Sequence, residues 1–263
     1  MKESSIPFVK ASACGNDFIV IGARGIKGDL IKLTRAICDR NLGVGADGVE
    51  WLYPSDQGDI KAHLINSDGS YAEISGNGTR CVAACLVSDS DMNEVRIETG
   101  AGVKTCTLLL RENSVFQFRT AMGKPEVGQP FNISLARREV RGVPVSLGNP
   151  HFVSFVEDFP AEWQSFAAAI QLRKDFFPDG VNVEFVKVIN DQEIEIRIFE
   201  RGAGETLSSG TGSSACAAAA IAVGRVQESV TVTSPGGPQI VTWRDELMLD
   251  GPARIICRGD YYL

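Results

Sequence analysis

The sequence predicts an α+β fold that contains an internal duplication. A short motif occurs twice, as SGNG at 75–78 and SGTG at 209–212, and each copy precedes a run of small helix-forming residues. Segments with strand character outnumber helical ones, and glycine-rich turns join many of them. The same order of elements returns after residue 130. These observations favour two similar halves over a doubly wound parallel sheet.

Apolar spacing and turn residues place the elements of the first half. We expect a strand at 18–21, a helix at 30–40, a glycine-rich loop at 41–48, a short strand at 63–66 with a turn at 67–70, and a helix after Gly78. Strands at 95–99, 105–111 and 116–119 follow, the first two joined by a turn at 100–102. The segment 123–130 is rich in glycine, proline and charge, and is the expected linker.

The second half repeats this order. We expect a helix at 163–171, strands at 183–188 and 194–199, the second SGxG helix, a hairpin of 230–233 with 239–243, and short strands at 247–249 and 253–257. The domain prediction is therefore an N-terminal half at 1–122, joined by the C-terminal strand 252–263, and a C-terminal half at 123–251. Each half has about 130 residues, an ordinary domain size.

Composition excludes several function classes. The chain has 263 residues, a net charge of −7 and no basic cluster longer than Arg137-Arg138, which argues against nucleic-acid binding. No apolar stretch reaches membrane-spanning length. The first five residues lack the basic-then-apolar layout of a signal peptide, so the expected location is cytoplasmic. The sequence leaves the oligomeric state open, a homodimer included.

The cysteines and histidines do not indicate a metal site. Seven cysteines form an odd set without paired ligand spacing, and the chain has only His63 and His151. Most of the thiols are expected to be small buried apolar groups. Cys81 and Cys85 lie four residues apart, as buried neighbours on one helix would.

The repeated SGxG motif is suited to binding an anion. Glycine lets the backbone turn sharply and approach a ligand, and free N–H groups at a helix start attract negative charge. Two such sites, half a chain apart, suggest two similar domains that face each other across one anionic substrate. The alternative is two unrelated glycine turns before buried helices, which the repetition makes less favourable.

Further polar segments suit an amino-acid ligand. Glycine and asparagine stand together at 15–16, 148–149 and 180–182, and a glutamate–arginine pair stands at 200–201. Asparagine both donates and accepts, arginine offers a fork to a carboxylate, and glutamate suits an ammonium. Each asparagine taken alone also fits a turn, and Glu200 with Arg201 also fits a surface ion pair.

Taken together, these segments resemble the diaminopimelate epimerase family over essentially the whole chain. The motifs are GNDF at 15–18, GVGADG at 43–48, N-SDGS at 66–70, SGNGTRC at 75–81, GNPH at 148–151, NVEFV at 182–186 and ERGAGETLSSGTG at 200–212. The last is the most specific. The resemblance implies two pseudo-symmetric halves, each a mostly antiparallel sheet wrapped around a central helix, with substrate between them. It also implies a cofactor-independent interconversion of L,L- and meso-diaminopimelate, for lysine and peptidoglycan synthesis.

The resemblance also implies roles for individual residues. Those that would hold the non-reacting end of the amino-acid substrate are Asn16, Asn66, Asn149, Asn182, Glu200 and Arg201. Those that would donate to the carboxylate at the reacting carbon are Gly76, Asn77, Gly210 and Thr211. His151 and Glu200 would lie beside the reacting pair, Ser75 and Ser209.

The chain departs from the family at that reacting pair, because both family acid–base residues are cysteines. A thiol has a pKa near 8.5, whereas a serine hydroxyl is about as weak an acid as water, near 15.7. The gap of roughly 7 units is worth on the order of 10 kcal/mol, and a helix dipole contributes only about 0.3–2 kcal/mol. Serine therefore needs a partner that takes its proton. His151 is the one partner that the sequence indicates for two serines.

Three interpretations follow from the departure. The chain is an epimerase whose cysteines were replaced, leaving binding intact and turnover very low. Alternatively, it is a natural relative that uses other groups, such as Glu200, His151 or Cys14, on diaminopimelate or on another amino or carboxylic acid. The third interpretation is a non-catalytic amino-acid binder. The intact binding motifs favour the first two, and they argue against a fold retained for packing alone.

Overall fold

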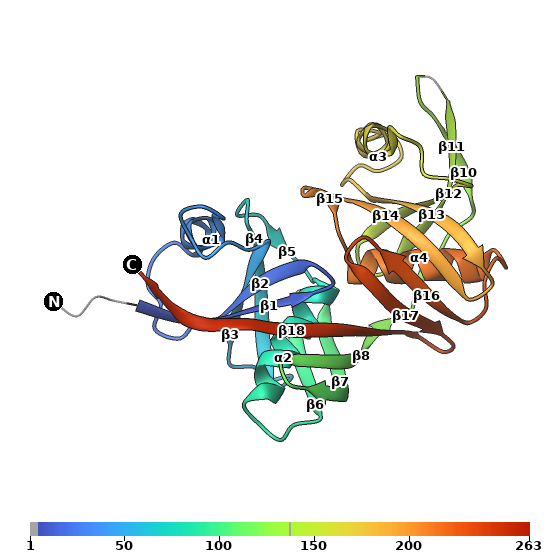
Figure 1. Cartoon of the computed structure of the whole chain (residues 1–263). Helices are drawn as coiled ribbons and strands as arrows, with labels where there is room; N and C mark the ends of the chain where they lie inside the picture. The colour runs from blue at the N-terminus through green and yellow to red at the C-terminus, as the bar shows by residue number, and fades with distance from the viewer. Residues whose placement is uncertain (1–4, 137) are drawn as a thin grey trace. The chain divides into compact units, whose positions relative to one another are not determined.

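The computed structural model describes residues 5–136 and 138–263 and shows an α+β architecture rich in strands (Figure 1). The chain divides into two compact units: unit 1 is Met1–Thr120 with Gly251–Leu263, and unit 2 is Ala121–Asp250. The sequence-based boundaries stand at 122/123 and 251/252. Residues 1–4, on which the signal-peptide expectation mainly rests, and Arg137 of the basic pair lie outside the described residues.

Unit 1 is a mostly antiparallel sheet with two helices. Its strands are β1 (Ser5–Ala13), β2 (Asn16–Gly22), β3 (Gly48–Tyr53), β4 (Ile60–Asn66), β5 (Tyr71–Ala72), β6 (Glu94–Thr99), β7 (Gly102–Glu112) and β8 (Val115–Gly123). The C-terminal part of β18 (Leu247–Tyr262) pairs with β1. The pairs β2–β3 and β4–β6 are parallel. Helix α1 (Leu30–Cys38) follows β2, and α2 (Gly76–Ser88) follows β5.

Unit 2 repeats this plan. Its strands are β9 (Glu126–Val127), β10 (Phe131–Ser134), β11 (Glu139–Ser146), β12 (Pro150–Phe155), β13 (Asn182–Asn190), β14 (Glu193–Glu200), β15 (Gly204–Thr206), β16 (Ser229–Ser234), β17 (Gly237–Trp243) and the start of β18. Helix α3 (Trp163–Gln171) connects β12 to β13, and α4 (Gly210–Ala222) connects β15 to β16. The parallel pairs are β12–β13 and β14–β16, at the places equivalent to β2–β3 and β4–β6. The predicted duplication is therefore confirmed at the level of topology.

Each unit has one helix that its own sheet surrounds (Figure 1). In α2 every residue from Gly76 to Cys85 is buried, and in α4 every residue from Gly210 to Ala220 is buried. A helix that is buried on all sides lies in a core, and the polar side chains in these two helices stand mainly in their first turns. Alanine, glycine, serine and cysteine supply most of these positions, so the surrounding strands approach the helix backbone closely. The sequence of α4, GTGSSACAAAAIA, is an extreme case.

Two expectations about strands need correction. The predicted short strands at 247–249 and 253–257 form one strand, β18, because Gly251 and Pro252 continue the extended backbone instead of turning. Residues before them pair with β17 and residues after them pair with β1. The expected linker at 123–130 also contains structure, since β9 pairs with β11 there. Proline and glycine favour turns and irregular backbone in both places, and the strand pairing overrode that local preference.

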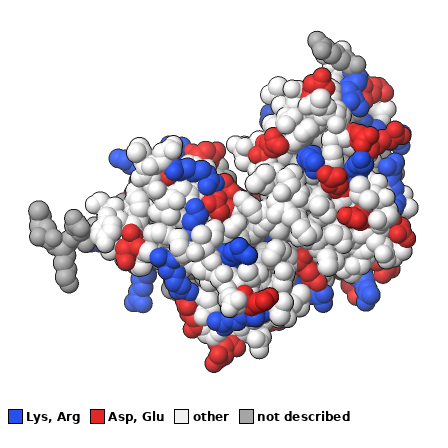
Figure 2. Space-filling view, viewed as in Figure 1, with Lys and Arg blue, Asp and Glu red and all other residues white. Residues whose placement is uncertain are grey.

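The surface carries mixed charge. On the face shown in Figure 2, acidic and basic side chains are interspersed. Among the described residues, no helix is long and apolar enough to cross a membrane.

The packing around α4 makes a stability prediction. We expect Ala218→Leu to lower the free energy of unfolding by about 1–3 kcal/mol, because Ala218 is fully buried and the added atoms must displace strands. Ala222→Leu, at the exposed end of the same helix, is the matched control and should change it by less than about 0.5 kcal/mol. Urea denaturation measures both. Equal effects of the two variants would contradict the enclosed position of α4.

Candidate active site

Ser75 begins helix α2. Its backbone is extended, with φ −123° and ψ 121°, and its Oγ accepts a hydrogen bond of 3.0 Å from the Gly78 backbone N–H. This is the geometry of an N-cap, for which serine is among the most favoured residues. Because the oxygen serves as acceptor, the hydroxyl proton remains available for donation.

Ser209 begins helix α4 in the same way. Its backbone has φ −141° and ψ 129°, and its Oγ accepts from the Gly212 N–H at 3.2 Å. The hydroxyl of Thr211 lies 3.4 Å from Ser209 Oγ. Both motif serines therefore cap a buried helix, with the first-turn N–H groups beside them.

A buried glutamate approaches each serine turn from the sheet. Glu50 on β3 is 3% exposed, and a methyl group added at Gly78 would overlap its Oε1 and lie 3.2 Å from Ser75 Cβ. Glu184 on β13 is fully buried, and a methyl group at Gly212 would lie 3.2 Å from its Oε1 and 3.3 Å from Ser209 Oγ. The second glycine of each SGxG motif thus admits a carboxylate to the first turn of the helix.

The two serine turns differ in the partner of that glutamate. In the parallel pair β2–β3, Phe18 lies opposite Gly48, two residues before Glu50. In β12–β13 the equivalent position opposite Asn182, two residues before Glu184, is occupied by His151. His151 Nδ1 lies 2.7 Å from Glu184 Oε1, and both side chains are buried. Unit 1 therefore has phenylalanine where unit 2 has histidine.

Burial dominates the proton affinity of both carboxylates. It raises the pKa of Glu50 to about 8. It also raises the pKa of Glu184, although the neighbouring His151 opposes part of that effect. A carboxyl group that holds its proton near neutral pH is suited to general acid–base chemistry.

A hydrogen-bond network in unit 2 connects most of the predicted site residues. His151 Nε2 lies 3.1 Å from Asn149 Oδ1, and Asn149 Nδ2 donates to Thr211 Oγ1 at 3.3 Å. Through Thr211 the network reaches Ser209. All of these residues belong to the GNPH and SGTG motifs, so two segments sixty residues apart form one polar cluster.

Asn182 joins this cluster to the glutamate–arginine segment. Its Nδ2 donates to the carbonyl of Pro150 at 3.1 Å, and its Oδ1 accepts from the Arg201 backbone N–H at 2.9 Å. The Arg201 guanidinium donates to the Asp179 carbonyl at 2.8 Å. Glu200 is the last residue of β14 and directly precedes Arg201.

Unit 1 brings fewer of its predicted residues together. Asn77 Nδ2 donates to Asn16 Oδ1 at 3.3 Å, and Asn16 Nδ2 donates to Asp47 Oδ2 at 2.6 Å. Asn66 donates instead to Ser70 Oγ at 3.0 Å, although its backbone lies opposite Gly48 in the sheet. Gly76 and Gly210 are the first residues of α2 and α4.

Sequence reasoning missed four residues of these clusters: Glu50, Glu184, Asp47 and Arg80. Arg80 is fully buried and donates to Asn77 Oδ1 at 2.6 Å. The sequence feature that could have identified Glu50 and Glu184 is an acidic residue inside a largely apolar strand, in the segments GVEWL and NVEFV respectively. The expectation that only His151 serves the two serines is therefore corrected, because each serine turn has a buried carboxylate of its own.

The cysteines do not replace the missing family thiols. Cys81 and Cys85 are buried on α2, as predicted, and burial raises the pKa of Cys81 and Cys216 far above its usual range. Cys14, named as an alternative acid–base group, is buried at the turn between β1 and β2 with φ 51°. None of the seven cysteines, all of which lie in the described part of the chain, forms a disulfide.

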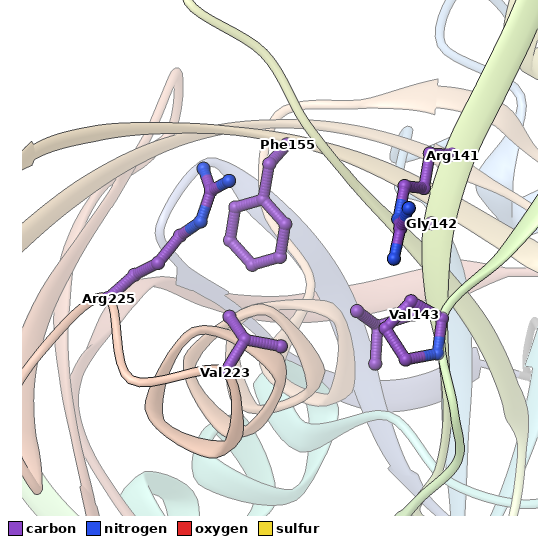
Figure 3. A pocket seen from close by; sticks show the side chains of 7 residues that line it. Arg141, Gly142, Val143, Phe155, Val223 and Arg225 are labelled. Atoms are coloured by element: carbon purple, nitrogen blue, oxygen red, sulfur yellow. The ribbon is translucent and has the colours of Figure 1, made fainter.

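A cavity of about 330 Å³ lies elsewhere in unit 2 (Figure 3). Its lining residues are Pro130, Arg141, Gly142, Val143, Phe155, Val223 and Arg225. Val223 and Arg225 follow the C-terminal end of α4, whereas Ser209 caps its N-terminus. A helix of 13 residues is about 20 Å long, so this cavity is separate from the serine site.

Comparison with known proteins supports one family. A family model described as diaminopimelate epimerase matches residues 8–127 and 143–256. The diaminopimelate epimerase of Moorella thermoacetica is 36% identical, covering 97% of this chain and 99% of the relative. That of Carboxydothermus hydrogenoformans is 37% identical, with the same coverage.

Solved structures agree on the fold. A hydroxyproline epimerase from Agrobacterium vitis superposes with a TM-score of 0.74 at 18% identity, covering 98% of this chain and 93% of that one. A PhzF-family phenazine biosynthesis protein from Bacillus anthracis gives 0.73 at 15% identity, covering 99% and 100%. At such identities the likeness concerns the fold alone.

The contact between Glu50 and the first turn of α2 makes a second prediction. Glycine-to-alanine changes inside helices usually stabilise by about 0.5–1 kcal/mol. We expect Gly78→Ala to destabilise by about 1–3 kcal/mol instead, because the methyl group meets Glu50 Oε1. In a Glu50→Ala background the same change should become stabilising. A double-mutant cycle by urea denaturation measures this coupling, and purely additive effects would contradict the contact.

Proposed function

This chain belongs to the diaminopimelate epimerase family, and on that premise we propose that it is an epimerase of diaminopimelate. The reaction would interconvert the L,L and meso forms by removing the α-proton from one face and adding a proton to the other. The comparisons support an isomerase of the epimerase and racemase class that acts on a small amino acid. The observation that carries the proposal is the duplicated serine turn, with first-turn N–H groups and a buried carboxylate in each unit.

We propose that units 1 and 2 are the two domains and that both serine turns act on one substrate. The backbone N–H groups of Gly76, Asn77, Gly210 and Thr211 would bind the carboxylate next to the reacting carbon. Removal of the α-proton places negative charge on that carboxylate, so donors at two helix N-termini stabilise the transition state more than the ground state.

The distal amino-acid end of the substrate would be held by the polar residues of the family motifs. These are Asn16, Asn66, Asn149, Asn182, Glu200 and Arg201. Their support is the network that joins Asn149 to Thr211 and Asn182 to Arg201. Diaminopimelate carries an ammonium and a carboxylate at each end, which suits this mixture of donors and acceptors.

Serine at both reacting positions favours a second candidate, an isomerase of another amino or carboxylic acid in the same site. Such an enzyme would racemise or isomerise a different acid and leave diaminopimelate unchanged. Circular dichroism of a panel of amino acids distinguishes the two candidates. A melting shift with diaminopimelate but no solvent exchange at any pH would instead identify a binding protein.

We also propose that the chain acts in the cytoplasm and needs no cofactor. No disulfide joins any two of the seven cysteines, and cysteines kept as thiols are typical of a reducing compartment. The two-base reaction needs only groups that accept and donate protons. A homodimer, which the sequence allows, stays a prediction that sedimentation analysis would test.

Deuterium exchange tests the proposed reaction. In D₂O, the wild-type chain should incorporate deuterium at the α-carbon of diaminopimelate and form the other epimer. The Ser75→Cys, Ser209→Cys double variant should be faster, because a thiol is a far stronger acid than a hydroxyl. Proton NMR measures exchange, and chiral chromatography measures inversion.

The matched control for this experiment is the Ser88→Cys, Ser229→Cys variant. Ser88 lies at the other end of α2, and Ser229 begins β16 in unit 2. Its rate should equal that of the wild type. A double variant at 75 and 209 that binds diaminopimelate yet exchanges no deuterium would rule out the proposed function.

A further inference from the structure

We propose that Glu50 takes the proton of Ser75 when this serine accepts the α-proton of the substrate, an inference that rests on the proposed function. Glu50 would be a positioning and proton-accepting residue that acts through Ser75. The first half-site then works as a serine–glutamate pair, and the second as a serine beside a glutamate–histidine pair.

The serine turn is a polar neighbour of Glu50. Its partners in the sheet are Val20 on β2 and Leu64 on β4, both apolar. The helix side is the first turn of α2, where Oε1 meets Gly78. A carboxylate enclosed by apolar strands is costly, so its retention calls for a role.

Two structural roles do not account for Glu50. A helix-capping carboxylate would accept the Gly78 N–H, but Ser75 Oγ already accepts it at 3.0 Å. A histidine-orienting carboxylate, the role that Glu184 fulfils beside His151, would need a histidine on the adjacent strand. The equivalent residue there is Phe18, which is 2% exposed and cannot hold a proton.

The other titratable groups on this side of α2 do not compete for the role. Arg80 is engaged with the Asn77 side chain and with the carbonyls of Gly76 and Pro252. Cys81 is buried, and burial together with the charge of Glu50 raises the pKa of its thiol. Glu50 itself has a pKa of about 8, far closer to neutrality than the serine hydroxyl.

The proton transfers balance. On one face of the substrate, the C–H bond at the α-carbon breaks and its electron pair moves into the substrate carboxylate. The released proton passes to Ser75 Oγ. At the same time the hydroxyl proton of Ser75 passes to Glu50. On the other face, the Ser209 hydroxyl gives its proton to the carbon and takes one from the Glu184–His151 pair. Glu50 gains one proton and that pair loses one. Proton exchange with solvent resets both groups before the next turnover in the same direction, and the reverse epimerisation resets them directly. Because each serine loses and gains a proton in the same step, no free alkoxide is formed.

The test compares Glu50→Gln in two backgrounds. With Ser75 present, the change should lower kcat for epimerisation about 10²- to 10⁴-fold, the usual contribution of a general base, with KM altered less than about threefold. The limb of the kcat–pH profile near pH 8 should also disappear. In the Ser75→Cys background the loss should stay below about tenfold, because a thiolate removes the proton unaided.

Glu98→Gln on β6 is the matched control. The carboxylate of Glu98 is already engaged by Lys61 at 2.7 Å and by the Ser55 hydroxyl at 2.6 Å, so the rate of this variant should equal that of the parent. Thermal unfolding of each variant separates lost folding from lost chemistry. An equal loss in the serine and cysteine backgrounds would overturn the proposal and assign Glu50 a structural role.

An activity-independent measurement separates this inference from the proposed function. Carbon-13 NMR of the glutamate carboxyl groups should show a resonance, absent in Glu50→Gln, that titrates near pH 8. Ser75→Ala should shift this titration and Ser209→Ala should not. The inference fails if Ser75→Ala leaves it unchanged, whatever the substrate proves to be. If the titration shifts but diaminopimelate is not turned over, only the proposed substrate fails.

Discussion

In each unit the candidate site depends on the contact between the first turn of a buried helix and a carboxylate from the sheet around it. The second glycine of each motif makes this contact possible, since any Cβ would meet the carboxylate at Gly78 and crowd it at Gly212. The same turn carries the capping serine and the N–H groups that would bind substrate. Small residues along α2 and α4 let the strands come close enough to present Glu50 and Glu184.

The parts of this structure that could be predicted are those that depend on residues close together in the sequence. Helix starts at the two SGxG motifs follow from capping chemistry, and the hairpin strands follow from apolar alternation and glycine turns. β18 was predicted as two short strands because Gly251 and Pro252 favour turns. Only pairing with β17 and β1 keeps the backbone extended through these two residues. Long-range pairing of this kind leaves no local signal.

The residues of the candidate site also divide into those that local sequence predicted and those that depend on packing in the folded chain. Asparagines beside glycine were found from the sequence, since a polar residue at a turn is conspicuous. Glu50 was missed because its approach to Gly78 arises only in the folded unit, and because its neighbours Val49 and Trp51 are those of an ordinary buried strand. His151 was found, whereas its bond to Glu184 depends on the parallel register of β12 and β13.

Serine at positions 75 and 209 is suited to capping a helix but not to acting alone as an acid–base group, whereas cysteine would serve as the acid–base group. As an N-cap, serine stabilises each helix start by about 1 kcal/mol relative to a residue that cannot accept the N–H. As an acid it is weaker than a thiol by roughly 7 pKa units, a deficit that no cap can offset. In the proposed reaction the proton would therefore be held elsewhere, and the two copies of the duplicated fold differ at that place. Histidine lies beside the glutamate in unit 2, whereas phenylalanine stands at the equivalent position in unit 1. Burial raises the pKa of both glutamates, and a neighbouring histidine opposes part of that effect only in unit 2, so one backbone plan gives the two proposed acid–base groups different surroundings.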